Sequence, residues 1–256
     1  MSTLVPKPIY REANSGRIVE VFSSAGDLFH AAARKVAEII SDCLKKKQSC
    51  TIALSGGSTP QRLYELLAKG EDGAIDWTRV QVFFSDERNV PPEDLESNYR
   101  MAKESLFASG LVPEANIHRI HGEFSANEAA QGYEEEIRRV LGNDPVFDLV
   151  LLGLGPDGHT ASLFPGSPAL NEDKKLVTAN RVEKLKTDRI TFTYPLLNQA
   201  GHVVFLASGA DKAKIVRAVL SGEGDYPAQH VKPDKGELLW MLDKDSASEY
   251  IERPTH

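Results

Sequence analysis

The chain has 256 residues, of which 41% are hydrophobic and 26% are charged, a composition typical of globular proteins. Its formal net charge is −7, so the molecule as a whole does not attract nucleic acid or an anionic membrane, and an anionic ligand would need local basic residues and backbone amides. No stretch approaches the roughly 20 apolar residues that span a bilayer, and the first residues lack the apolar core of a signal peptide. We therefore expect a cytoplasmic protein.

The predicted secondary structure alternates strands and helices along a single α/β domain, residues 1–256. In chain order we expect a helix at 27–47, a strand at 51–54, a helix that Pro60 opens, a strand at 80–84, a helix from 97 or 98 to 107, a helix from 125 to 141, strands at 147–152, 176–182, 189–194 and 202–207, a helix at 210–220 and a strand at 238–242. Ser125 and Glu128 form a capping box at the start of the fourth helix. Neither an internal repeat nor a Pro/Gly/Ser-rich linker divides the chain.

This alternation implies right-handed crossovers and a mainly parallel, Rossmann-like sheet with helices on both faces, a three-layer fold. In such sheets the ligand binds outside the carboxyl ends of the strands. Four segments that follow predicted strands are rich in glycine or polar residues: 55–59, 85–88, 153–159 and 208–212. We expect the functional site where these four segments meet.

The first of these segments has the sequence SGGSTP at 55–60. Gly56 and Gly57 let backbone N–H groups approach an anion, and Ser58 and Thr59 add hydroxyl groups at the start of a helix. The pattern is neither a P-loop, because G-x-x-x-x-G-K-[ST] is missing, nor a nucleophile elbow, because proline stands where the last glycine belongs. An ordinary β–α turn capped by Thr59 is the alternative.

The third segment contains the spacing of a dinucleotide-binding fingerprint. Gly153, Gly155 and Gly158 spell G-x-G-x-x-G after an apolar strand. That fingerprint requires a sustained helix after its third glycine, and a Pro-Gly pair soon afterwards stops any helix. The run also contains Asp157 and His159, a pair better suited to proton transfer than to binding a pyrophosphate. We therefore predict a functional histidine here, with a structural histidine as the alternative.

The remaining candidates are charged residues near predicted strand ends. Asp86 and Arg88 follow a strand, where charges fit poorly in a core unless they are paired or face a cleft; an exposed ion pair is the alternative. Lys212, one turn into a helix, could reach a phosphate as a point charge, or it could be an ordinary exposed lysine. Arg189, which opens a strand, is a second basic candidate.

Residue types that bind metals or form disulfides are sparse. The two cysteines, Cys43 and Cys50, form no C-x-x-C motif, so we expect free, buried thiols in a reducing compartment. His118 and His121 have H-x-x-H spacing in a strand-like stretch, without cysteine or a third ligand nearby, and we predict no metal site there.

Together these motifs resemble the 6-phosphogluconolactonase family, within the glucosamine-6-phosphate isomerase/deaminase-like superfamily. The resemblance covers nearly the whole chain and rests on LSGGSTP (54–60), FFSDER (83–88), SNYR (97–100), LGPDGHTASLFPG (154–166), RITFT (189–193) and SGADK (208–212). The core at 157–159 is shared with the deaminase branch, whereas the residues that follow it and Arg88 look lactonase-like.

The resemblance implies the deaminase/isomerase-like fold and hydrolysis of 6-phospho-D-glucono-1,5-lactone to 6-phosphogluconate, with no metal or organic cofactor. Its partner would be the small-molecule sugar-phosphate lactone, with no nucleic acid and no membrane, and we expect a monomer or a small homo-oligomer. His159 would act as the general base toward water and Asp157 would orient it. Arg88 or glycine-loop amides would stabilise the oxyanion, and Asp86 would orient the sugar or Arg88.

The residues expected to bind the phosphate and hydroxyl groups are Gly56, Gly57, Ser58, Thr59, Gly155, Gly158, Arg189 and Lys212. Two alternatives remain: an amino-sugar-phosphate deaminase or isomerase on the same scaffold, and, from another functional class, a non-catalytic sugar-phosphate sensor. Sensors of this kind usually carry an appended DNA-binding segment, and we expect none in this acidic chain.

Overall fold

The computed structural model describes residues 6–14, 16–70 and 73–251. Its main sheet has seven strands in the order β1-β2-β10-β9-β6-β3-β4, and all neighbours are parallel except β1 and β2. The strands are β1 (Tyr10–Asn14), β2 (Arg17–Phe22), β3 (Cys50–Leu54), β4 (Val80–Phe84), β6 (Leu149–Gly153), β9 (His202–Ala207) and β10 (Glu237–Asp243). The predicted parallel sheet is confirmed, and β1 and β2 were not predicted.

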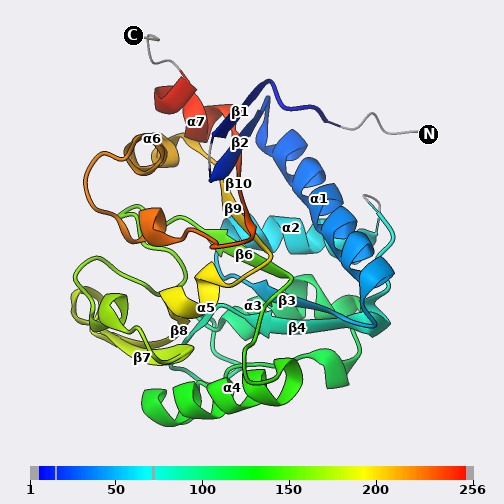
Figure 1. The fold of residues 1–256 in the computed structure, drawn as a ribbon, viewed down its shortest axis with the longest axis vertical. Coiled ribbons are helices and arrows are strands. Elements are labelled where there is room, and N and C mark those ends of the chain that lie inside the picture. The colour runs from blue at the N-terminus through cyan, green and yellow to red at the C-terminus, as the bar shows by residue number, and fades with distance from the viewer. Residues whose placement is uncertain (1–5, 15, 71–72, 252–256) are drawn as a thin grey trace.

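Helices cover both faces of this sheet, as the right-handed crossovers require. They are α1 (Ala25–Lys46), α2 (Ser58–Lys69), α3 (Asn98–Ser105), α4 (Ala126–Leu141), α5 (Tyr194–Asn198), α6 (Ala213–Ser221) and α7 (Lys244–Ile251). In Figure 1, α1 and α2 lie on one side of the sheet and α6 and α7 on the other. Among the described residues, every helix is too short or too polar to traverse a bilayer.

Helix boundaries follow local sequence signals. Ser24 caps α1 by accepting a hydrogen bond from the N–H of Asp27, and Ser97, rather than Asn98, caps α3. The predicted capping box of Ser125 at the start of α4 is confirmed. Hydrophobic residues at four-residue intervals form the buried stripe of α1: Leu28, Ala32, Val36 and Ile40, each no more than 1% exposed.

A second, antiparallel sheet of three strands lies beside the first. Its order is β5 (Asp86–Arg88), β8 (Thr187–Phe192) and β7 (Val177–Val182). The prediction of a loop at 85–88 was wrong, as was the placement of 176–182 and 189–194 in the parallel sheet. Only one 3-10 turn, Glu183–Leu185, and Lys186, with a φ of 50°, separate β7 from β8, so the two strands form a hairpin and no crossover helix lies between them. Figure 1 shows this hairpin beside α4.

Ser85 joins the two sheets. This fully buried residue lies between β4 and β5. Its N–H donates to the carbonyl of Leu54 in the main sheet at 2.8 Å, and its carbonyl accepts from the N–H of Phe192 in the small sheet at 2.8 Å. One residue therefore fixes the position of β5 relative to the carboxyl end of β3.

Candidate active site

A pocket of about 160 Å³ opens at the carboxyl ends of β3, β6 and β9, next to β5. Most of the predicted site residues line it: Gly56, Gly57, Ser58, Thr59, Asp86, Arg88, Gly155, His159 and Lys212. Three predicted residues lie outside its lining, namely Asp157, Gly158 and Arg189. The four segments chosen from the sequence thus meet at one place, although they come from widely separated parts of the chain.

The glycines of the third segment accommodate the histidine. The N–H of Gly155 donates to the carbonyl of His159 at 2.8 Å, and a Cβ on Gly155 would lie 2.0 Å from Nδ1 of that histidine. Gly158 has a φ of 77° and packs against Tyr226, where a Cβ would approach to 2.5 Å. No helix follows within residues 154–167. The spacing of a dinucleotide fingerprint is therefore present without the helix that it requires.

His159 is held on two sides. Its Nδ1 lies 2.5 Å from Oδ1 of Asp157, and its ring stacks on Phe164 with centroids 4.1 Å apart. An ionised carboxylate can only accept a hydrogen bond, so the proton of the neutral imidazole stays on Nδ1 and Nε2 keeps its lone pair. Partial burial works to raise the pKa of Asp157, but the hydrogen bond and charge of His159 outweigh it, and the pKa falls below its ordinary value. Asp157 thus acts on the pocket through the histidine.

Glu87 ties β5 to the start of α3. Its carboxylate, only 2% exposed, accepts hydrogen bonds from the N–H groups of Arg88, Asn98 and Tyr99 at 2.7–2.8 Å and from the Ser97 hydroxyl at 3.0 Å. Burial raises the pKa of Glu87, although these hydrogen bonds oppose the shift. The backbone of Arg88 and the start of α3 are consequently fixed to one carboxylate.

Asp86 and Asn98 form the wall between the two sheets. The buried Asp86 carboxylate accepts from the Ser162 hydroxyl at 2.6 Å, and the Asn98 side-chain amide donates to the Asp86 carbonyl at 2.9 Å. A Cβ on Gly56 would lie 1.9 Å from Oδ1 of Asn98, so glycine is needed where this amide passes over the loop. Asn98 lines the pocket, although the sequence analysis placed it only at the start of a helix and in the SNYR motif and did not predict it as a site residue.

Two arginines lie opposite each other in the small sheet. Arg88 pairs with Arg189 across β5 and β8, so their side chains point to the same face. Arg88 donates to the carbonyl of Glu96, whereas Nη1 of the buried Arg189 has no hydrogen-bond partner among the described residues. Burial, and next the positive charge of Arg88, lower the pKa of Arg189. The Arg189 guanidinium is therefore a buried cation with one N–H group that lacks an acceptor, next to the pocket residue Arg88.

The start of α2 and Lys212 face the pocket from the main sheet. α2 begins after Gly57, at a φ of 103°, without a side-chain cap, so amides of its first turn remain for a ligand. Lys212 lies 3.9 Å from a carboxylate oxygen of Asp211 and is mostly buried. The glycine of the segment 208–212 is bonded within the chain: the N–H of Gly209 donates to Asp243 at 3.1 Å.

Comparison with known proteins shows to which family this chain belongs. The family model described as glucosamine-6-phosphate isomerases/6-phosphogluconolactonase matches residues 23–240. The chain belongs to this family. A 6-phosphogluconolactonase of Synechocystis sp. is 42% identical over 234 residues, which cover 88% of this chain and 95% of the relative. The human 6-phosphogluconolactonase is 37% identical, covering 90% of this chain and 92% of its own.

Solved structures agree with the family assignment. The 6-phosphogluconolactonase from Trypanosoma cruzi superimposes with a TM-score of 0.82 at 32% identity, covering 94% of this chain and 99% of that one. The one from Trypanosoma brucei gives a TM-score of 0.78 at 31% identity, covering 91% and 98%. The predicted deaminase/isomerase-like fold is therefore confirmed.

The H-x-x-H pair lies outside the pocket, with His118 buried and His121 exposed. His118 bonds to Glu136 at 2.6 Å and to Gln81 at 2.8 Å, and His121 contacts Glu123 at 3.1 Å. The stretch is not a strand, apart from one isolated bridge at Ile117. Because the two histidines bond to different carboxylates, they form no three-ligand cluster among the described residues.

Proposed function

We propose that the protein hydrolyses 6-phospho-D-glucono-1,5-lactone to 6-phosphogluconate in the oxidative pentose phosphate pathway. One observation carries the proposal: His159, oriented by Asp157, faces the same small pocket as Arg88 and Lys212. A base and two cations suit an ester that carries a phosphate at its far end. The relatives and structural neighbours named 6-phosphogluconolactonase support the same reaction.

His159 acts as the general base. Because Asp157 accepts a hydrogen bond from the Nδ1–H group, Nε2 is free to remove a proton from water as the water oxygen attacks the lactone carbonyl. The C1–O bond of the ring then breaks, and the imidazolium returns its proton to the departing ring oxygen. General-base catalysis of this kind contributes about 10²–10⁴ to a rate.

Arg88 and Asp86 act on the reacting end of the sugar. The guanidinium of Arg88 stabilises the negative charge that develops on the carbonyl oxygen, and Glu87 fixes the backbone that carries it. The Asp86 carboxylate, held by Ser162, accepts from a sugar hydroxyl group or orients Arg88. Gly155 and Gly158 contribute by leaving space for His159 and Tyr226.

The phosphate binds where positive charge and backbone donors gather. The first turn of α2 offers amides and the hydroxyl groups of Ser58 and Thr59, and Lys212 supplies a charge from the facing loop. The unpartnered Nη1 of Arg189 offers a further donor to the phosphate or to a sugar hydroxyl group. These local groups compensate for the net charge of −7, which by itself repels an anionic substrate.

We further propose that the protein works in the cytoplasm, as a monomer or small homo-oligomer, on free substrate. The two unpaired cysteines and the acidic composition support this setting. Some relatives carry "chloroplastic" in their names, among them one from Arabidopsis thaliana that is 35% identical, so the same chemistry operates in more than one compartment.

The test compares the protein with His159→Ala on lactone prepared in situ, with the spontaneous opening rate subtracted. We expect kcat to fall by about 10²–10⁴ with KM changed little, because the histidine acts on water rather than on the phosphate. His121→Ala, at a half-exposed histidine outside the pocket, is the matched control and should retain full activity. Near-normal turnover by His159→Ala would contradict the assignment of the base.

Glucosamine 6-phosphate separates this proposal from its nearest rival. A lactonase should release no ammonia from that amino sugar above background. Ammonia release without lactone hydrolysis would identify a deaminase. Sugar-phosphate binding without either reaction would identify a sensor.

A further inference from the structure

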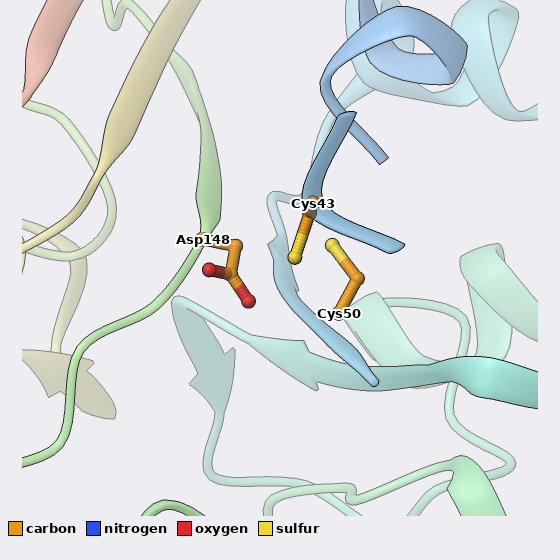
Figure 2. A group of neighbouring side chains, drawn as sticks. All are labelled: Cys43, Cys50 and Asp148. Carbon is orange, nitrogen blue, oxygen red and sulfur yellow. The ribbon is translucent and has the colours of Figure 1, made fainter. Parts of the chain in front are cut away.

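A second cluster of reactive side chains lies at the amino edge of the main sheet. Cys43 belongs to the last turn of α1, Cys50 begins β3, and Asp148 immediately precedes β6. One ligand atom from each, two Sγ atoms and a carboxylate oxygen, lie within 4.8 Å of one another. Figure 2 shows the two sulfur atoms turned toward each other with the carboxylate beside them. The active-site pocket opens at the other edge of the same sheet.

Asp148 is oriented by its own hydrogen bonds. Oδ2 accepts from the N–H and the hydroxyl of Thr51 at 3.0 and 3.1 Å, and Oδ1 accepts from Nζ of Lys47 at 2.5 Å. The Asp148 side chain is only 12% exposed. Partners of this kind orient ligating carboxylates in metal sites.

Arg79 fixes the segment that joins the two cysteines. Its guanidinium donates to the main-chain carbonyls of Leu44, Lys47 and Gln48 at 2.8–3.1 Å. Cys50 is fully buried and Cys43 is partly exposed, so the cluster is reached from the side of α1. Because this segment is already fixed, a ligand that binds between the two cysteines would cost little conformational entropy.

We propose that Cys43, Cys50 and Asp148 bind a thiophilic divalent metal ion of the Zn²⁺ class. Thiolate sulfur selects zinc over magnesium or calcium. With Zn–S bonds of about 2.3 Å, tetrahedral geometry places two sulfurs about 3.8 Å apart, so the two Sγ atoms have to approach each other by no more than about 1 Å. Water takes the fourth position, on the partly exposed side of Cys43.

The charges of the cluster also favour a divalent cation. Two thiolates and a carboxylate bring three negative charges to one place, and a divalent cation together with the Lys47 ammonium balances them. Binding releases the two thiol protons to solvent, so affinity rises with pH.

The carboxylate favours a metal over a disulfide between the same cysteines. Cysteines that sense oxidants are exposed and have positive neighbours, which favour the thiolate. Here Cys50 is inaccessible, and the neighbouring ammonium of Lys47 is paired with Asp148, which places negative charge beside both sulfurs. That carboxylate disfavours thiolates in the absence of a cation and attracts a cation to them.

The experiment uses Co²⁺ as a spectroscopic substitute for Zn²⁺ on chelator-treated, reduced protein. We expect one Co²⁺ per chain, with the thiolate-to-cobalt charge-transfer absorption that only cysteine ligands produce and visible bands of tetrahedral intensity. Zn²⁺ should displace it and raise the melting temperature. Because the chain has only two cysteines, a charge-transfer band can come from no other site.

Matched variants assign the ligands. Cys43→Ser should abolish the charge-transfer band or reduce it strongly, and Asp148→Asn should weaken Co²⁺ binding at least about tenfold, the lower end of what even outer-shell losses cost. Asp42→Asn removes the same charge one residue from Cys43, at an exposed carboxylate paired with Lys45, and should leave affinity unchanged. If Asp148→Asn unfolds, Cys43→Ser together with the Zn²⁺-dependent melting shift of the unmodified protein still tests the site.

Several results would overturn the proposal. These are the absence of a charge-transfer band, equal affinity in Asp148→Asn and Asp42→Asn, or rapid formation of a Cys43–Cys50 disulfide by peroxide in protein that binds no Co²⁺. Lactone turnover should be the same with and without metal, because the cluster lies at the opposite edge from the pocket. Loss of turnover on removal of the metal would contradict the separation of this metal site from the catalytic pocket.

Discussion

Strands β3 and β6 of the main sheet are apolar along almost their whole length, whereas β5 and β8 of the small sheet carry charged residues within the strands. In the main sheet, functional groups appear only where strands end, as in the loop that carries His159. In the small sheet, Asp86, Glu87 and Arg189 are all buried. One sheet therefore supports the site from its edge, and the other contributes side chains from its interior.

The difference has an energetic consequence. Burying a charge costs free energy unless hydrogen bonds or an opposite charge compensate for it. Glu87 is compensated by four hydrogen bonds from the chain itself, but Nη1 of Arg189 has no partner among the described residues. We infer that the small sheet gives up stability for binding, whereas the loops of the main sheet do not.

The largest effect after loss of His159 itself should come from Asp157→Asn, in a loop of the main sheet. The amide keeps the shape but can donate to Nδ1, which would put the imidazole in the wrong tautomer for accepting a proton on Nε2. We expect kcat to fall by about 10²–10⁴, with KM and melting temperature almost unchanged. Steady-state kinetics measure kcat and KM, and calorimetry measures the melting temperature. A loss of stability as large as that of a core variant would contradict the contrast between the loops of the main sheet and the small sheet.

Arg189→Met should show the opposite combination. Replacing a buried, incompletely paired cation with an apolar side chain should raise the free energy of unfolding by about 1–3 kcal/mol, while the lost donor raises KM about tenfold or more. Arg88→Met is the matched control in the neighbouring strand. Because Arg88 is already bonded to the carbonyl of Glu96, its loss should not stabilise the fold. Chemical denaturation of both variants measures the free energy of unfolding, and lactone kinetics measure KM. Equal stabilisation by Arg88→Met and Arg189→Met would contradict this prediction.

The smallest effect concerns the pH dependence of stability at Glu87. Burial raises the pKa of Glu87, so the folded state holds its proton more tightly than the unfolded state. The contribution of Glu87 is therefore fully present below the unfolded pKa of 4.5 and is lost as pH rises through the folded pKa. The stability difference between the protein and Glu87→Gln should shrink as pH rises above 4.5, as denaturation at several pH values would show.

Glu123 provides the control of opposite sign. Its hydrogen bond to Arg119 is the main reason that its pKa is lowered to about 2. Its contribution is present above 4.5 and is lost as pH falls toward 2, so the stability difference for Glu123→Gln should shrink in the acidic direction. If both variants shifted in the same direction, the contrast between the buried and the paired carboxylate would be refuted.

Five of the seven strands of the main sheet, all except β1 and β2, could be predicted because their signals are local. Apolar runs such as 147–152, the glycine-containing turns after them and the capping box at Ser125 each depend on neighbouring residues, and the rule for strand ends correctly grouped four segments around one pocket. The steric need for glycine at 155 was not visible, because it depends on where the His159 ring comes to lie.

The small sheet could not be predicted because its pairing is non-local. β5 has three residues and pairs with a strand about a hundred residues later, so its charged sequence resembled an exposed loop. Asn98 was missed as a pocket residue for the same reason: its contact with Gly56 depends on α3 packing beside the first loop. The approach of Asp148 to the two cysteines depends likewise on the strand order, which places β6 next to β3.

The junction at Ser85 bears on how a growing chain acquires its active site. The bond from Ser85 to Leu54 joins segments made early, but the bond from Phe192 to Ser85 has to wait until β8 has been synthesised. Until then the strand with Asp86, Glu87 and Arg88 has no partner, while β3 and β4 can already pair. During translation the arginine side of the active site is therefore completed after the first strands of the main sheet, and a chain released before residue 187 has no complete site.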